Sequence, residues 1–200
     1  MVKIKICGLT RLEDIDIVNK YKPDYIGFVF AESKRKVSNK IAKKLKDNLN
    51  SNIKSVGVFV NAPKEEILDL FNDGIIEIAQ LHGTESEEYI IDLKESTNNE
   101  LKIINAIEMS GDTDLIKYDS SNADYLLLDS GKGSGKTFDW SLIRKDLKKE
   151  FFLAGGLDSD NISEAIEEFD PYAVDLSSSL EVNGFKDKDK IKEIMEIIHE

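Results

Sequence analysis

Alternation of short apolar runs with amphipathic or charged stretches constrains the fold of this chain more than any other feature. The runs, such as Gly57-Val58-Phe59-Val60, are apolar on both faces, as parallel strands covered by helices should be. The expected strand–helix pairs are 2–7 with 12–21, 25–30 with 39–49, 55–60 with 64–72, 76–81 with 86–94, 101–107 with 113–118, 125–129 with 140–147, 151–154 with 161–169, and 173–176 with 188–199. Each unit is close to the smallest workable βαβ repeat.

Eight such units predict an α/β fold in which parallel strands close into a (β/α)₈ TIM barrel. The chain of 200 residues is at the lower limit of that fold's size range. An open, doubly wound sheet is the alternative, but it would leave two edge strands and usually has fewer units. No Pro-rich, Ser-rich or low-complexity linker interrupts the pattern, so we expect residues 1–200 to form one domain.

The predicted barrel also indicates where the active site should be. Enzymes with this fold use residues at the C-terminal ends of the strands and in the loops that follow them. Uncommon or reactive residue types gather at those positions, which packing alone does not explain. The candidates are Cys7, Arg35 within the run 33–36, His82, Asp129, Gly155, Gly156, Ser177 and Ser178.

Cys7 and Asp129 are the candidates for acid–base chemistry, and each has a structural alternative. A lone cysteine is more often a small buried hydrophobe, but Cys7 ends a strand beside Gly8. We expect nearby cations to lower the pKa of this thiol and make it a base. Asp129 could cap a helix, yet Asp139 has the better position for that role.

The remaining candidates suit substrate binding. The run 33–36 reads equally well as a solvated surface segment, but Arg35 could bind a carboxylate through two parallel hydrogen bonds. Gly155-Gly156 and Ser177-Ser178 follow the seventh and eighth strands, where this fold commonly binds phosphate through backbone N–H groups. The alternative for both is a tight turn. His82 is as compatible with a structural hydrogen bond as with a substrate contact.

The glycine-rich loop after Asp129 has a rival interpretation as a nucleotide-binding P-loop. Gly135-Lys136-Thr137 matches the end of that motif, but Ser130 stands where the motif needs its first glycine. We therefore do not expect a P-loop.

Charge and composition exclude several partner classes. The net charge of −12 disfavours nucleic acid and anionic membranes as partners, whereas a small anionic ligand remains compatible with local backbone amides. One cysteine excludes an internal disulfide, and two histidines are too few for a His-rich metal site. We find neither a signal peptide nor a membrane-spanning run, and we expect a cytoplasmic protein. The sequence does not decide between a monomer and a homodimer.

Seven short motifs follow one another along the predicted strands and loops. They are Lys5-Ile6-Cys7-Gly8-Leu9-Thr10, Gly27-Phe28-Val29-Phe30 with Ser33-Lys34-Arg35, Val56-Gly57-Val58-Phe59-Val60-Asn61, Gln80-Leu81-His82-Gly83, Leu128-Asp129 with Gly133-Ser134-Gly135-Lys136-Thr137-Phe138-Asp139-Trp140, Ala154-Gly155-Gly156-Leu157, and Ala173-Val174-Asp175-Leu176-Ser177-Ser178. In these motifs and their order, the chain closely resembles the phosphoribosylanthranilate isomerase family. Three positions depart from the family pattern: Ser179 and Lys132 stand where glycines are usual, and Asn183 where a proline is common.

The resemblance implies an Amadori rearrangement of N-(5-phosphoribosyl)anthranilate in tryptophan biosynthesis, with no cofactor and no metal. It implies that Asp129 is the general acid and Cys7 the general base. The substrate-binding residues that it implies are Arg35 for the anthranilate carboxylate, Gly155, Gly156, Ser177 and Ser178 for the phosphate, and His82.

Two other classes of function remain in competition. One is a different phosphosugar enzyme on the same barrel, such as a ribulose-phosphate epimerase or an indole-glycerol-phosphate synthase. The epimerase would need more histidines at strand ends than His82 alone, and the synthase relies on rim lysines and glutamates. The other is a barrel that binds a phosphate ligand without catalysis, although the presence of Cys7 and Asp129 argues against it.

Overall fold

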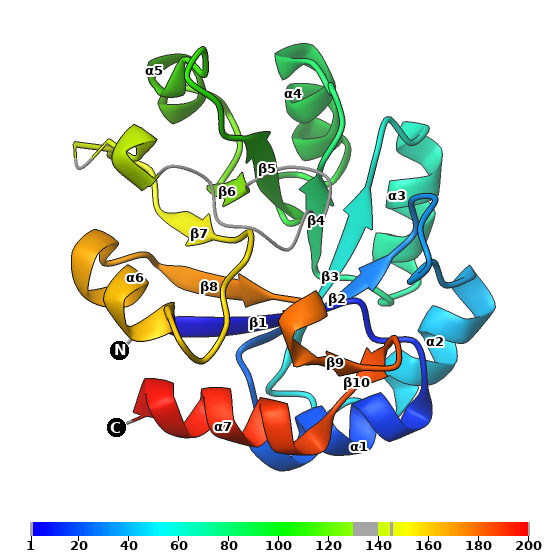
Figure 1. Cartoon of the computed structure of the whole chain (residues 1–200). Helices are drawn as coiled ribbons and strands as arrows, with labels where there is room; N and C mark the ends of the chain where they lie inside the picture. The colour runs from blue at the N-terminus through cyan, green and yellow to red at the C-terminus, as the bar shows by residue number, and fades with distance from the viewer. Residues whose placement is uncertain (1, 130–139, 145, 200) are drawn as a thin grey trace.

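A closed barrel of eight parallel strands organises the structure (Figure 1). The computed structural model describes residues 2–129, 140–144 and 146–199. The barrel strands are β1 (Lys3–Cys7), β2 (Tyr25–Val29), β3 (Lys54–Phe59), β4 (Ile78–Leu81), β5 (Lys102–Glu108), β6 (Tyr125–Asp129), β7 (Phe151–Leu153) and β8 (Ala173–Leu176). Each strand pairs with the next, and β1 pairs with β8 to close the ring. The predicted (β/α)₈ barrel is confirmed, and the open sheet is wrong.

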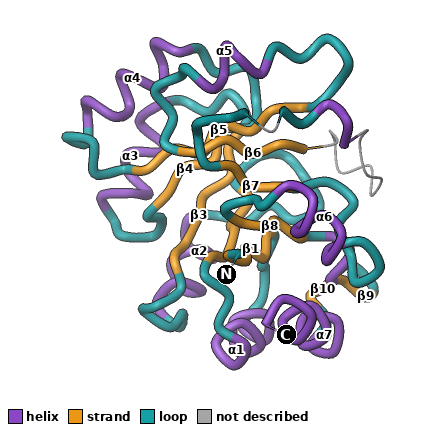
Figure 2. The backbone as a smooth tube through the Cα atoms, turned by 90° about the vertical axis from the view of Figure 1, so that its left-hand side faces the viewer, coloured by secondary structure: helices purple, strands orange, loops and turns teal. Residues whose placement is uncertain are grey.

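Helices surround the strands on the outside of the barrel (Figure 2). The α-helices of the described residues are α1 (Leu12–Tyr21), α2 (Asn39–Asp47), α3 (Lys64–Asn72), α4 (Glu87–Ser96), α5 (Leu115–Asp119), α6 (Ile162–Phe169) and α7 (Lys188–His199). Ser38 and Ser86 cap α2 and α4, because the hydroxyl oxygen of each accepts a hydrogen bond from the backbone N–H three residues on. Within the part of the chain that the structure describes, none of the helices has the length and apolar character needed to cross a bilayer.

Between β6 and β7 the chain departs from the predicted pattern. The sequence predicts a helix over 140–147, but the described residues form only the 3₁₀ helix η1 (Trp140–Leu142). The guanidinium of Arg144 donates to both carboxylate oxygens of Asp146, at 2.9 and 2.7 Å. Side chains two residues apart do not face each other on an α-helix, so this pair is incompatible with the predicted helix. Asp139, the predicted helix cap, lies outside the described residues.

A small hairpin that the sequence pattern does not predict follows β8. The chain passes through the 3₁₀ helix η2 (Ser178–Leu180) into β9 (Glu181–Val182) and β10 (Phe185–Lys186), which pair antiparallel. The two turn residues, Asn183 and Gly184, have φ of 53° and 82°. A type I′ turn needs positive φ at both positions and favours Asn-Gly, whereas proline cannot adopt positive φ. The turn therefore explains why asparagine is suited to this position.

The apolar side chains pack in two separate clusters, one on each side of the barrel wall. On β1, Ile4 and Ile6 belong to the cluster between the strands and the helices. Lys5 and Cys7 alternate with them and point into the barrel, whose interior apolar cluster includes Leu127 of β6. The same alternation turns Asp129, two residues after Leu127, toward the inside. Strand register thus places two reactive side chains at one end of the barrel interior.

Candidate active site

A cavity of about 800 Å³ opens at the C-terminal ends of the strands. All eight residues singled out in the sequence line it: Cys7, Arg35, His82, Asp129, Gly155, Gly156, Ser177 and Ser178. They come from β1, β6 and the loops after β2, β4, β7 and β8. Closure of the barrel therefore brings together side chains that are far apart in the sequence.

Cys7 is the last residue of β1 and lies beside Gly27 of β2. A Cβ atom at Gly27 would lie 2.7 Å from the Sγ atom of Cys7, so the missing side chain makes room for the thiol. Burial raises the pKa of Cys7, while the positive charge of Lys5 opposes that shift. The prediction that cations lower the pKa of this thiol is therefore wrong, because desolvation outweighs them.

A buried ion pair joins β1 to β8 inside the barrel. The Nζ atom of Lys5 donates to Oδ2 of Asp175 at 2.7 Å, and Lys5 is fully buried. Burial acts to lower the pKa of Lys5, but the charges of Asp175 and Cys7 raise it, so Lys5 remains a cation. Asp175 lines the cavity and is not among the residues predicted from the sequence. Its position near the end of the predicted strand 173–176, two residues before the candidate Ser177, is the signal that could have identified it.

Asp129 and His82 are neighbours in the cavity wall. The Nε2 atom of His82 lies 3.3 Å from Oδ2 of Asp129. The Asp129 side chain is 12% exposed and that of His82 is 30% exposed, so the carboxyl is the more sheltered of the two. His82, predicted as a substrate contact, is therefore also placed to orient Asp129. Asp129 at the end of β6 is separated from Cys7 at the end of β1 by two strands, β7 and β8.

Arg35 lies in the loop after β2 and is already paired with a carboxylate of the protein. Its Nε and Nη2 atoms donate to Oε1 and Oε2 of Glu181 at 2.6 and 2.9 Å. The Nζ atom of Lys186 donates to Oε1 of Glu181 and to the backbone oxygen of Ser177, both at 2.9 Å. Glu181 and Lys186 are not among the residues predicted from the sequence, because no local pattern aligns the hairpin with the β2 loop.

The loops after β7 and β8 present backbone groups to the cavity. Gly155 and Gly156 have φ of 86° and 69°, a conformation that favours glycine. No described residue accepts a hydrogen bond from the backbone N–H of either glycine. The hydroxyl of Ser177 donates to the backbone oxygen of Cys7 at 3.0 Å, and Ser178 begins η2. Free N–H groups of this kind can bind an anion.

One of the departures from the family pattern, Ser179, concerns the segment after β8. Ser179 lies within η2 and is not among the residues with positive φ, so a serine is accommodated there without that strain. Lys132 lies outside the described residues.

This set of groups supports acid–base chemistry on an anionic molecule. A thiol and a carboxyl on separate strands can exchange protons with two atoms of one bound substrate. Arg35 and the free N–H groups offer sites for two anionic groups. Among the described residues, no cluster of three or more His, Cys, Asp or Glu side chains is placed to hold a metal ion.

Comparisons with known proteins point to one family. The model of the family described as N-(5'-phosphoribosyl)anthranilate (PRA) isomerase matches residues 4–197. The N-(5'-phosphoribosyl)anthranilate isomerase of Clostridium acetobutylicum is 44% identical, over 98% of this chain and 97% of the relative. That of Endomicrobium trichonymphae is 46% identical, over 99% and 98%.

Solved structures give the same result. The phosphoribosyl anthranilate isomerase of Thermus thermophilus superposes with a TM-score of 0.89 at 30% identity, covering 99% of this chain and 98% of that one. A phosphoribosyl anthranilate isomerase in complex with reduced 1-(o-carboxyphenylamino)-1-deoxyribulose 5-phosphate superposes with a TM-score of 0.85 at 35% identity, covering 100% and 99%.

Proposed function

The chain belongs to the N-(5'-phosphoribosyl)anthranilate isomerase family, and we propose that Asp129 is the catalytic acid and Cys7 the catalytic base of its reaction. That reaction converts N-(5'-phosphoribosyl)anthranilate into 1-(2-carboxyphenylamino)-1-deoxyribulose 5-phosphate, a step of tryptophan biosynthesis. The observation that carries the proposal is that a thiol and a carboxyl from non-adjacent strands line one cavity.

Ring opening is the step assigned to Asp129. The protonated carboxyl gives its proton to the ring oxygen of the ribose, the bond from C1 to that oxygen breaks, and the lone pair of the anthranilate nitrogen forms the Schiff base. The carboxylate that remains lies 3.3 Å from Nε2 of His82, a side chain that the structure places beside it.

Proton removal from C2 is the step assigned to Cys7. The thiolate takes the C2 proton, and the electrons of that bond form the enolamine, which then tautomerises to the ketone. Lys5 supports this step, because its positive charge favours the thiolate against the effect of burial.

Two anionic groups of the substrate have candidate sites in the cavity. Arg35 binds the anthranilate carboxylate, and the backbone N–H groups near Gly155, Gly156 and Ser178 bind the phosphate, with Ser177 supporting that loop. A phosphosugar is thus the proposed partner, rather than nucleic acid or a membrane.

An anthranilate-fluorescence assay with freshly made substrate tests the proposal. The wild-type protein should consume N-(5'-phosphoribosyl)anthranilate, and Cys7→Ala and Asp129→Asn should each lower kcat by about 10²–10⁴-fold. Arg35→Ala should mainly raise KM. Wild-type rates in either purified catalytic variant would refute the assignment of that residue.

We also propose that the enzyme works in the cytoplasm, as a monomer or a homodimer. Its single cysteine fits a reducing compartment. Sedimentation at several protein concentrations decides between the two association states.

A further inference from the structure

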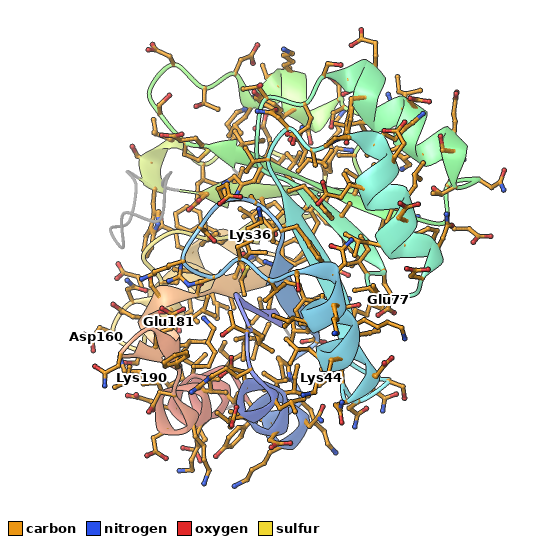
Figure 3. All side chains as sticks on the ribbon, turned by 90° about the vertical axis from the view of Figure 1, so that its right-hand side faces the viewer. Lys36, Lys44, Glu77, Asp160, Glu181 and Lys190 are labelled. Atoms are coloured by element: carbon orange, nitrogen blue, oxygen red, sulfur yellow. The ribbon has the colours of Figure 1, made fainter. Side chains whose placement is uncertain are left out.

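Glu181 is a buried carboxylate at the active site to which the mechanism above gives no role. It is the first residue of β9, and its side chain is only 6% exposed. Unlike Arg35, it is not among the residues that line the cavity. Figure 3 marks Glu181 on the segment that leads into α7. The carboxylate therefore lies behind the Arg35 guanidinium, as seen from the cavity.

The two hydrogen bonds between Arg35 and Glu181 occupy one edge of the guanidinium. Nε and one N–H of Nη2 donate to Glu181, at 2.6 and 2.9 Å. A guanidinium carries five N–H groups, so both N–H groups of Nη1 and the second of Nη2 remain. No described residue accepts a hydrogen bond from these three. Their edge is suited to a second carboxylate in the same bidentate geometry.

Glu181 is itself held from the opposite side. The fully buried Nζ atom of Lys186 donates to it at 2.9 Å and also to the backbone oxygen of Ser177. Burial acts to raise the pKa of Glu181, but the hydrogen bonds from Arg35 and Lys186 lower it to about 2. Glu181 is therefore a fixed anion at neutral pH, anchored to the hairpin and to the β8 loop.

Gly8 lets Arg35 reach this partner. A Cβ atom at Gly8 would lie 2.4 Å from Cδ of Arg35, so any side chain there would displace the arginine. The stem of Arg35 thus passes directly over the backbone beside Cys7 before its head group meets Glu181. Backbone, carboxylate and buried lysine together leave the guanidinium little freedom to turn.

We propose that Glu181 is a positioning residue for substrate specificity: it holds Arg35 by one edge so that the other edge selects an aromatic amine that carries a carboxylate. The inference rests on the proposed binding of that carboxylate by Arg35. The opposite reading is that Glu181 competes with the substrate for Arg35. The two readings predict changes of opposite sign when the charge of Glu181 is removed.

The test is Glu181→Gln in the full-length enzyme, with KM and kcat measured separately. Loss of the positioning carboxylate should raise KM about tenfold and leave kcat within about twofold. Reduced 1-(o-carboxyphenylamino)-1-deoxyribulose 5-phosphate should bind about tenfold more weakly, whereas the same compound without its carboxyl should bind both proteins equally. Glu196→Gln on α7, which removes an equal charge from an exposed pair with Lys192, is the matched control and should change nothing.

A double variant separates positioning from a general loss of structure. In an Arg35→Ala background, Glu181→Gln should have no further effect on KM, because the residue being positioned is gone. If Glu181→Gln unfolds the chain by leaving Lys186 unpaired, Glu181→Gln with Lys186→Met is used in its place.

A lower KM or an unchanged KM in Glu181→Gln would overturn the proposal, the first by identifying Glu181 as a competitor. Equal weakening for both compounds would assign Glu181 a structural role instead. Absence of turnover in the wild-type protein would refute the proposed function itself, which the other outcomes leave intact.

Discussion

At the scale of single residues, Gly27 leaves room for the Cys7 thiol, which we propose as the catalytic base. Its backbone lies beside Cys7, and a Cβ atom there would come within 2.7 Å of Sγ and 3.2 Å of the Cys7 Cα atom. Gly27→Ala should therefore push the thiol away from the substrate and lower kcat about 10–100-fold, with a smaller change in KM. Steady-state kinetics with the fluorescence assay measures both.

Gly111→Ala provides the control for that experiment, because nothing lies within 4 Å of a Cβ atom at this position. It should keep wild-type kinetics. If Gly27→Ala also keeps the wild-type kcat, the thiol either tolerates the shift or is not the base.

Some site residues can be predicted from the sequence, whereas others become evident only from the structure. Cys7 and Asp129 end strands, so their position in the pattern is enough to place them at the mouth of a barrel. Asp175 stands two residues before the candidate Ser177, but its pairing with Lys5 becomes visible only once β1 and β8 are known to be neighbours in register. Glu181 cannot be assigned to the site without the path of the irregular segment after β8, which hydrophobic periodicity does not predict.

At the scale of elements, the β9–β10 hairpin depends on its two-residue turn. Asn183 has φ of 53°, a conformation that asparagine tolerates and alanine does not. Asn183→Ala should lower stability by about 1–2 kcal/mol, and Asn183→Gly should be close to neutral. For a chain of this size the alanine variant should melt about 2–8 °C lower, as measured by circular dichroism. Equal melting temperatures for the two variants would contradict the type I′ assignment.

The regular elements are where prediction from the sequence succeeds. The predicted ranges of α1, α3, α7, β6 and β8 match the observed bounds, because their apolar periodicity and end signals agree. The helix predicted over 140–147 is wrong, because η1 ends at Leu142 and the hydrogen bonds between Arg144 and Asp146 have a spacing that an α-helix does not allow. The hairpin is missed although Asn183-Gly184 is a strong turn signal, since its strands of two residues are too short to show alternation.

At the scale of the whole molecule, the two ends of the barrel have different roles. Asp24, Glu77 and Asp124 directly precede β2, β4 and β6. Each accepts a hydrogen bond from a backbone N–H in the preceding strand, at 2.9, 3.1 and 3.0 Å respectively. In Figure 3, Glu77 lies toward the right of the view and Glu181 toward the left. Recurrence before β2, β4 and β6 indicates that these carboxylates fasten the N-terminal end of the barrel, away from the cavity at the C-terminal end.

Substitution of Asp124 tests whether the N-terminal end of the barrel contributes to stability and not to activity. Its carboxylate also accepts hydrogen bonds from Lys94 and Lys102 at 2.9 and 3.0 Å. Burial opposes the shift, but the hydrogen bonds from Lys94, the Ile103 amide and Lys102 hold the pKa of Asp124 below its usual value. Asp124→Asn should cost about 1–3 kcal/mol at pH 7, which lowers the melting temperature by about 2–12 °C. Its kcat/KM at 25 °C should equal that of the wild-type protein.

The pH dependence of the stability lost in Asp124→Asn shows whether the charge of the carboxylate is responsible. A carboxyl whose pKa is lower in the folded than in the unfolded chain stabilises the fold above its unfolded pKa of about 4 and loses that effect as the pH falls further. The difference in melting temperature between Asp124→Asn and the wild-type protein should therefore be full at pH 7 and shrink below about pH 4. Asp47→Asn, which removes an exposed partner of Lys43 on α2, should show little difference at either pH. If the difference in melting temperature between Asp124→Asn and the wild-type protein stays the same below pH 4, the ionised carboxylate of Asp124 is not what stabilises this end of the barrel.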